Sequence, residues 1–148
     1  MRALVLLTAI GAVLLFAAPV QATAPADVLI QIDTTVPSEG LPFGPFTATG
    51  PVCPSGTTVD VFGKSVGFAS GNRLQILVVK QFTCADGSGT FSLLFRVHIT
   101  FEPFSDTFTW TVVDGTGAYT RLHGSGSGFG TPTPNGATDT LTGGVHID

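Results

Sequence analysis

Glycine occupies every second position from residue 124 to residue 130, after a strand-like segment and a Gly-Thr-Gly turn. Successive residues of a β-strand point to opposite faces, so these glycines leave one face of a strand without side chains. A strand can bend sharply along such a face, or another backbone can approach it closely. Segment 107–130 is therefore expected to lie where a curved β-sheet closes on itself.

The clearest strand is expected over residues 90–102, where apolar and polar residues alternate. The apolar face carries Phe91, Leu93, Phe95, Val97, Ile99 and Phe101. The other face carries Ser92, Leu94, Arg96, His98, Thr100 and Glu102. An alternation of this length indicates one buried face and one face that at least partly meets water.

A loop of residues 103–106 is predicted to join this strand to a second one over residues 107–113. The register that brings the two apolar faces together is the one a buried core selects. It pairs Phe101 with Phe108, Ile99 with Trp110, and Val97 with Val112.

Further strands are predicted at residues 27–33, 46–49, 57–62, 74–84 and 138–148, with 64–70 as another candidate. Proline and glycine recur through residues 34–56, which excludes a helix there and makes the strand at 46–49 short or peripheral. Closing a sheet on itself hides every strand edge. We therefore expect an all-β fold, a single antiparallel barrel of about eight strands.

Residues 1–22 are expected to be a cleaved signal peptide, with a second acceptable cleavage site after Ala24. Arg2 precedes an apolar run, and small residues surround Ala22. A membrane anchor is the alternative, but an apolar run of about 16 residues is short for a span, and no basic cluster follows it. The barrel domain would then comprise residues 23–148 of a secreted, extracellular protein without an integral membrane span.

The charge of the exported part limits the classes of partner that it is expected to bind. Without Arg2, the exported part keeps five Lys or Arg residues against ten Asp or Glu, and no basic stripe is present. Nucleic acids and anionic membrane surfaces are therefore excluded as expected partners.

Cys53 and Cys84 are the two cysteines, and in an oxidising compartment they are expected to form a disulfide. Their spacing carries no metal-binding signature, so we expect neither a metal nor a cofactor.

Residues 112–119, with the sequence VVDGTGAY, are followed by Gly124, Gly126 and Gly128. This pattern resembles the strand–GTG–aromatic–glycine signature of the allene oxide cyclase and dirigent superfamily, and is most similar to its small secreted bacterial members. Asp114 stands where that pattern usually has glycine. The resemblance implies an eight-stranded antiparallel barrel with a central cavity, often assembled as a homo-trimer. The barrel-closure motif it implies comprises Gly115, Gly117, Tyr119, Gly124, Gly126 and Gly128, with Tyr119 packed on the glycine face. It implies no catalytic residue at an identified position here.

Two groups of residues are weak candidates for chemistry. Arg96 and His98 lie about 6–7 Å apart on one strand face. If that face lined the lumen, they would suit an anionic head group or a carbonyl, but the outward orientation is favoured because the opposite face is wholly apolar. Asp114, Tyr119, Arg121 and His123 would gather near the barrel mouth, where a Tyr/His/Asp set can do acid–base work. The simpler interpretation makes Tyr119 a packing residue and Asp114 a turn residue.

Other catalytic classes lack their signatures. The Gly115-Thr116-Gly117 segment begins like a dinucleotide fingerprint, but Thr120 replaces the third glycine and no helix follows. His98 and Glu102 would stand roughly 13 Å apart, too far for one metal ion. No G-x-S-x-G motif is present, and no pair of carboxylates has a spacing that suggests a glycosidase.

These observations favour a non-catalytic secreted barrel that binds a small hydrophobic molecule in its lumen, or a structural or interaction module. The alternative is an isomerase or cyclase of the allene oxide cyclase or dirigent type, which would confine a hydrophobic substrate away from water. An open β-sandwich used in adhesion is a third hypothesis. The residues that face the lumen discriminate among these, because a completely filled lumen excludes a ligand and a wholly apolar one argues against catalysis.

Overall fold

The computed structural model describes residues 24–67 and 71–148. The predicted signal peptide lies outside these residues, as does the end of the candidate strand at 64–70. Eight strands and one short helix follow in order: β1 (Ala26–Thr35), β2 (Phe43–Thr49), β3 (Ser55–Gly67), β4 (Arg73–Cys84), β5 (Thr90–Phe101), β6 (Phe104–Gly115), the 3-10 helix η1 (Gly117–Tyr119), β7 (Leu122–Thr133) and β8 (Gly136–Ile147).

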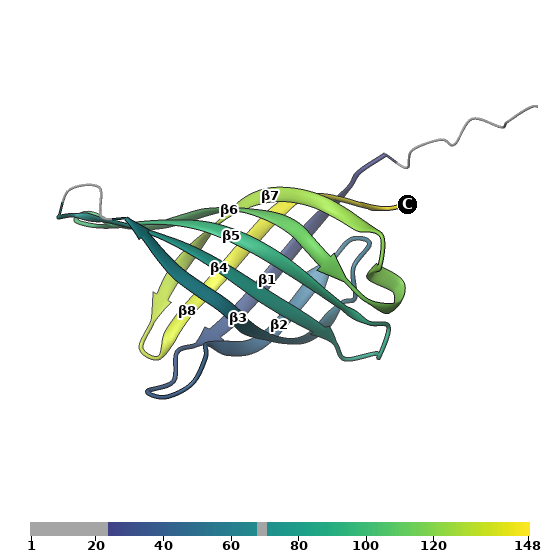
Figure 1. The fold of residues 1–148 in the computed structure, drawn as a ribbon, viewed down its shortest axis with the longest axis horizontal. Coiled ribbons are helices and arrows are strands. Elements are labelled where there is room, and N and C mark those ends of the chain that lie inside the picture. The colour runs from purple at the N-terminus through teal and green to yellow at the C-terminus, as the bar shows by residue number, and fades with distance from the viewer. Residues whose placement is uncertain (1–23, 68–70) are drawn as a thin grey trace, which may run out of the picture.

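Each strand pairs with the next in antiparallel fashion, and β1 pairs with β8 (Figure 1). The sheet is therefore a closed barrel, which confirms the predicted fold class. An open sandwich would leave the first and last strands unpaired, so the adhesion-type sandwich hypothesis is wrong. β2 is short, as predicted, but it is not peripheral, because it pairs with both β1 and β3.

The predicted register of the β5–β6 hairpin is wrong. Phe101 lies opposite Phe104 rather than Phe108, and the turn consists of Glu102 and Pro103 alone. Val97 faces Phe108 as a result, and Phe95 faces Trp110. Because the displacement is an even number of residues, the apolar faces still coincide, and the alternating pattern could not distinguish the two registers. The true register places Phe101 beyond the core, with 51% of its surface exposed.

One end of the barrel is sealed. The Cys53–Cys84 disulfide confirms the predicted bond and ties the β2–β3 connection to the end of β4. At the same end the ring of Tyr119 packs edge-on against Phe91, and its hydroxyl lies 3.2 Å from Ser88 Oγ. Phe82 stacks on Phe91 just inside, with ring centroids 4.7 Å apart. We call this the closed end.

The glycines of β7 make room for aromatic rings. A Cβ at Gly126 would stand 2.6 Å from Cζ2 of Trp110, and one at Gly128 would meet the ring of Phe108. The Trp110 indole crosses β7 and donates a hydrogen bond to the Thr142 carbonyl oxygen on β8, at 3.2 Å. The predicted glycine face is therefore real, but Trp110 and Phe108 cover it. Tyr119, which was expected to pack on it, packs against Phe91 at the closed end.

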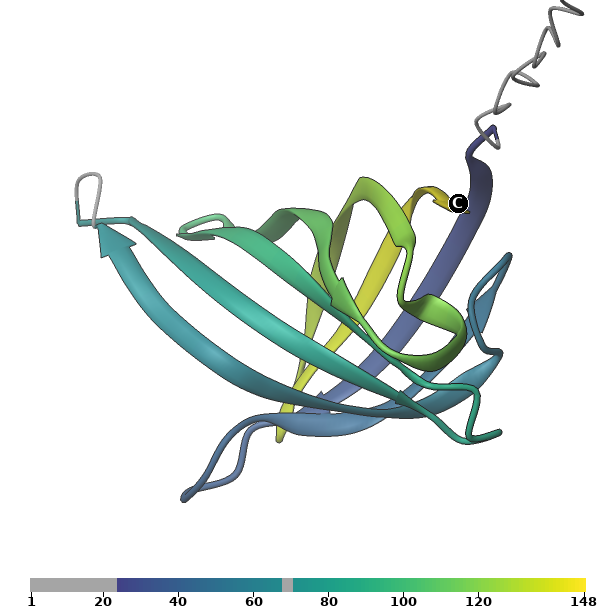
Figure 2. The same cartoon turned by 45° about the vertical axis from the view of Figure 1, so that its right-hand side comes forward.

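The other end of the barrel is open on one side. β2 pairs with β3 no farther than Val59, whereas β3 and β4 remain paired to Gly67 and Gln75. The β3–β4 and β5–β6 hairpins consequently extend past the ends of the remaining strands (Figure 2). We call residues 60–67, 73–79 and 97–106 the overhang, and this end the open end.

Candidate functional site

The residues predicted as candidates for chemistry do not converge on the lumen. Arg96 and His98 are exposed, on the face opposite to the buried Phe95. This is the outward orientation that the sequence favoured. They border a shallow groove on the outside of β4 and β5 together with Gln75 and Leu77.

Asp114, Tyr119, Arg121 and His123 do not form an acid–base set. Tyr119 is buried with 5% of its surface exposed, whereas the other three are exposed. No hydrogen bond or ion pair joins any two of these four residues in the described structure. His123 instead stacks on His146 at 5.4 Å, and its Nε2 lies 3.3 Å from Asp148 Oδ2.

A polar network that the sequence analysis missed lies inside the barrel at the open end. Lys80 has only 4% of its surface exposed, and its Nζ lies 2.6 Å from Asp60 Oδ1. That contact is ionic rather than a well-directed hydrogen bond. Lys80 Nζ is also 3.5 Å from Thr34 Oγ1, at the outer limit of a hydrogen bond. The Thr34 hydroxyl donates to Asp139 Oδ2 at 3.1 Å, which carries the network across the lumen from β4 to β8.

A second carboxyl group approaches Asp139 from β6. Asp106 and Asp139 both pair with Gly130, which lies between them on β7. A Cβ at Gly130 would stand 2.5 Å from Asp106 Oδ2 and 3.0 Å from Asp139 Oδ1. Both carboxyl groups therefore lean over the same glycine, a proximity that the sequence analysis did not identify.

Burial determines how these carboxyl groups titrate. It raises the pKa of Asp139 to about 6, a shift that Lys80 and the Thr34 hydrogen bond oppose and that Asp106 and Asp60 increase. Burial also raises the pKa of Asp106. Its Oδ1 atom is buried and has no hydrogen-bond partner. Asp139 can thus exchange a proton close to neutral pH.

The sequence does carry a signal for this network. On each strand the charged residue falls in the same alternating series as buried apolar residues. Lys80 precedes Phe82, Asp106 precedes Phe108, and Asp139 precedes Leu141, each by two positions. A charged residue at an inward position is unusual because ions are costly to bury unpaired. What the pattern cannot supply is the distance across the barrel.

Apolar side chains continue from this network onto the overhang. Ile99 pairs with Asp106 across the β5–β6 hairpin, and Phe101 pairs with Phe104 at its tip. By strand alternation these residues share the face that buries Phe91, Leu93 and Phe95. Phe101 and Phe104 are nevertheless each 51% exposed. The open end therefore presents a half-exposed apolar surface directly beside two carboxyl groups.

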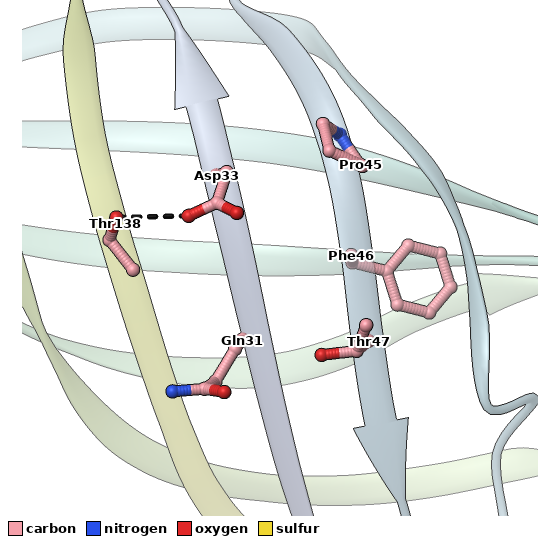
Figure 3. Close-up of a pocket in the computed structure, with 6 residues that line it drawn as sticks. All are labelled: Gln31, Asp33, Pro45, Phe46, Thr47 and Thr138. Atoms are coloured by element: carbon pink, nitrogen blue, oxygen red, sulfur yellow. Dashed lines mark hydrogen bonds between the residues drawn. The ribbon is translucent and has the colours of Figure 1, made fainter.

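The outer face of β8, β1 and β2 carries a different depression, lined by Gln31, Asp33, Pro45, Phe46, Thr47 and Thr138 (Figure 3). The Thr138 hydroxyl donates to Asp33 Oδ1 at 2.9 Å, so these two side chains already pair with each other. Exposed Gln31, Asp33 and Thr47 make it an external groove and not an entrance to the lumen.

Within residues 24–67 and 71–148, no group of three or more His, Cys, Asp or Glu side chains is arranged to hold a metal ion. No helix in the described part of the chain has the length and apolar character needed to cross a membrane. Compared with known proteins, the chain matches no family model, no curated protein and no solved structure.

Proposed function

We propose that this chain is a secreted, non-catalytic β-barrel protein that binds a small hydrophobic molecule at its open end. The observation that carries the proposal is the exposure of Phe101 and Phe104 on the strand face that elsewhere forms the core. Fully burying one such side chain is worth about 1.5–3 kcal/mol. A ligand that covered the exposed halves of both rings would gain roughly that amount from them.

The packing of the barrel restricts where such a ligand would lie. Trp110, Phe82, Phe91 and Leu93 fill the middle and the closed end, each with about 1% of its surface exposed or less. The lumen expected from the sequence is therefore occupied there by the protein's own side chains. The overhang and the mouth beneath it are the part of the inner face that remains accessible.

Binding of the uncharged dye Nile red, followed by its fluorescence, tests this proposal. The double variant Phe101→Ser/Phe104→Ser should bind the dye about tenfold more weakly than the unmodified protein, given the burial energy of the two rings. Phe129→Ser is the matched control, because Phe129 is 52% exposed on the outer face of β7. Equal weakening by the control, or no dye binding to the unmodified protein, would reject the proposal.

Export is the second component of the proposal, and the Cys53–Cys84 disulfide supports it because such bonds persist in oxidising compartments. Removal of residues 1–22 would leave Thr23 at the new N-terminus. Expression of the whole chain in a bacterial host, with N-terminal sequencing of the exported product, tests this. A product that retains Met1 would contradict it. From the proposed similarity to the allene oxide cyclase and dirigent superfamily, we also propose that the chain forms a homo-trimer. Light scattering tests this, because it distinguishes a trimer from a monomer.

A second candidate function, an isomerase or cyclase for a hydrophobic substrate, is favoured by one observation. The open end places Asp139, with a pKa of about 6, near apolar surface, and such a group can donate and accept protons near neutral pH. Asp139, with Asp106 beside it, therefore replaces Tyr119 and His98 as the residue to test. Conversion of an unsaturated epoxide should be faster with the protein than without it, and Asp139→Asn should remove the difference. An identical product distribution with and without protein would reject this candidate.

A further inference from the structure

We propose that the hydrophobic ligand of the open end carries a protonated amine, which Asp106 and Asp139 bind. This inference rests on the proposed binding function and adds the chemical class of the ligand. The charged side chains that face the mouth are mostly acidic. Among the described residues that face inward there by strand alternation, Asp60, Asp106 and Asp139 contribute carboxyl groups and Lys80 contributes an ammonium group.

Lys80 already has an ion-pair partner within the protein. Its ion pair with Asp60 spans 2.6 Å, and both side chains are largely buried, at 5% and 13% exposed. Asp106 and Asp139 form no ion pair with any residue in the described parts of the chain. Once Lys80 and Asp60 neutralise each other, the mouth retains two carboxyl groups without a cation. An anionic ligand would be repelled from this position.

The hydrogen-bonding state of Asp106 points to a missing donor. Its Oδ1 atom is buried and accepts no hydrogen bond. A buried acceptor without a donor destabilises the protein, so a ligand N–H that reached it would remove that penalty. Asp139 accepts from Thr34 through Oδ2, which leaves its Oδ1 turned toward Gly130 and Asp106. An ammonium group offers three donors and one positive charge, which suits this pair of oxygens.

The neighbours of Asp106 indicate the chemical character of the rest of the ligand, beyond its ammonium group. Ile99 stands opposite it on β5, and Phe101 and Phe104 continue the same face toward the tip of the hairpin. A ligand with its ammonium group at the carboxyl pair would lay its apolar body along these side chains. A bare metal ion fits less well, because within the described residues the carboxyl groups are not arranged as a metal site. The class is therefore a primary amine with an apolar chain.

Calorimetric titration at pH 7.5 with octylamine, octanol and octanoate, all below their micellar concentrations, tests the inference. The three probes share one chain and differ in head group. Octylamine should bind about tenfold or more tightly than octanol, because a hydrogen bond to a charged group contributes about 1.5–3 kcal/mol. Octanoate should bind most weakly. Asp106→Asn should reduce the preference for octylamine over octanol, whereas Glu102→Gln, on exposed surface near the same hairpin, should preserve it.

The outcomes separate the two proposals. Equal binding of octylamine and octanol would overturn the amine inference and leave the hydrophobic binding function intact. Binding of none of the three probes would reject the binding function, and the inference with it. If Asp106→Asn does not fold, Phe104→Ser provides a second check. It should weaken octylamine and octanol by the same factor and preserve their ratio. A preference for the amine that disappears in Phe104→Ser would contradict its assignment to the carboxyl pair.

Discussion

Asp106 and Asp139 lean toward each other across Gly130, so that one carboxyl oxygen of each lies within 3.0 Å of the point where a Cβ of residue 130 would stand. Neither carboxyl group forms an ion pair within the described structure. Burial and the proximity of Asp106 both favour the protonated form of Asp139. This relationship concentrates negative charge at the one end of the barrel that is not sealed, and it has consequences for stability as well as for binding.

The first prediction concerns pH. Burial raises the pKa of Asp139 from 3.8 to about 6, so the folded state holds a proton that the unfolded state releases between these two values. Stability should therefore fall as pH rises from 4 to 7, by up to about 3 kcal/mol for this group. Asp139→Asn should remove that loss and make the protein more stable at pH 7. Urea unfolding at pH 4.5 and 7.5 measures both effects.

The control for this prediction is Asp27→Asn, because Asp27 is exposed on β1. It should leave the pH dependence of unfolding as it is in the unmodified protein. Equal stability of the unmodified protein and Asp139→Asn at both pH values would show that Asp139 has an ordinary pKa.

The second prediction concerns Lys80 and Asp60. Lys80→Met should lower the free energy of unfolding by about 3–5 kcal/mol, because it leaves the Asp60 carboxylate buried without its cation. The double variant Lys80→Met/Asp60→Leu should recover most of that loss, since replacing both members of a buried pair by apolar residues is often neutral. Denaturant unfolding of the two variants provides the comparison. A double variant no more stable than Lys80→Met would mean that the pair is not the cause.

The third prediction concerns the glycine face. Gly126→Ala places a methyl group against the Thr142 carbonyl oxygen of β8 and 2.6 Å from Trp110 Cζ2, so both β8 and the indole must shift, at a cost of about 1–3 kcal/mol of stability. Trp110 is the single tryptophan, so its fluorescence reports the displacement directly. Gly63→Ala is the control, because a Cβ there meets no atom within 4 Å. An unshifted emission spectrum in Gly126→Ala would place the indole elsewhere.

The fourth prediction concerns the closed end. Cys53 and Cys84 are 31 residues apart, and closing a loop of that length stabilises a protein by about 3–4 kcal/mol through the unfolded chain. Cys53→Ser/Cys84→Ser should lose about that much stability in chemical unfolding. Binding of an apolar ligand at the opposite end should be unchanged under conditions where the variant is folded. Loss of binding in the folded variant would indicate that the site is not at the open end.

The fold could be predicted from local patterns because strand alternation and turn residues carry it. The β5–β6 register could not, since pairing Phe101 with Phe104 or with Phe108 leaves the same residues on each face. Because the register was ambiguous, the sequence did not show that Asp106 belongs to the candidate site. With the predicted register Asp106 belongs to a loop, whereas the true register places it inside the barrel, level with Gly130 and Asp139.

The rest of the polar network could not be predicted because it depends on pairing between strands that are distant in the sequence. Lys80 and Asp139 each stand in an apolar series, which marks them as inward-facing, but the sequence does not show that Thr34 connects them. That connection spans 46 residues on one side and 105 on the other. It arises only when β1 closes against β8, which is the step that local patterns describe least well.

A ligand site at the open end is tested by a chemical-shift map of the ¹⁵N-labelled protein titrated with octanol, an uncharged probe of the proposed hydrophobic site. Backbone amides of residues 97–106 and 73–79 should shift together with one saturation curve. Amides around Ser88 and Tyr119, at the closed end, should not move. Shifts confined to the closed end or to the outer groove at Gln31 and Thr47, or no saturable shifts at all, would contradict a ligand site at the open end.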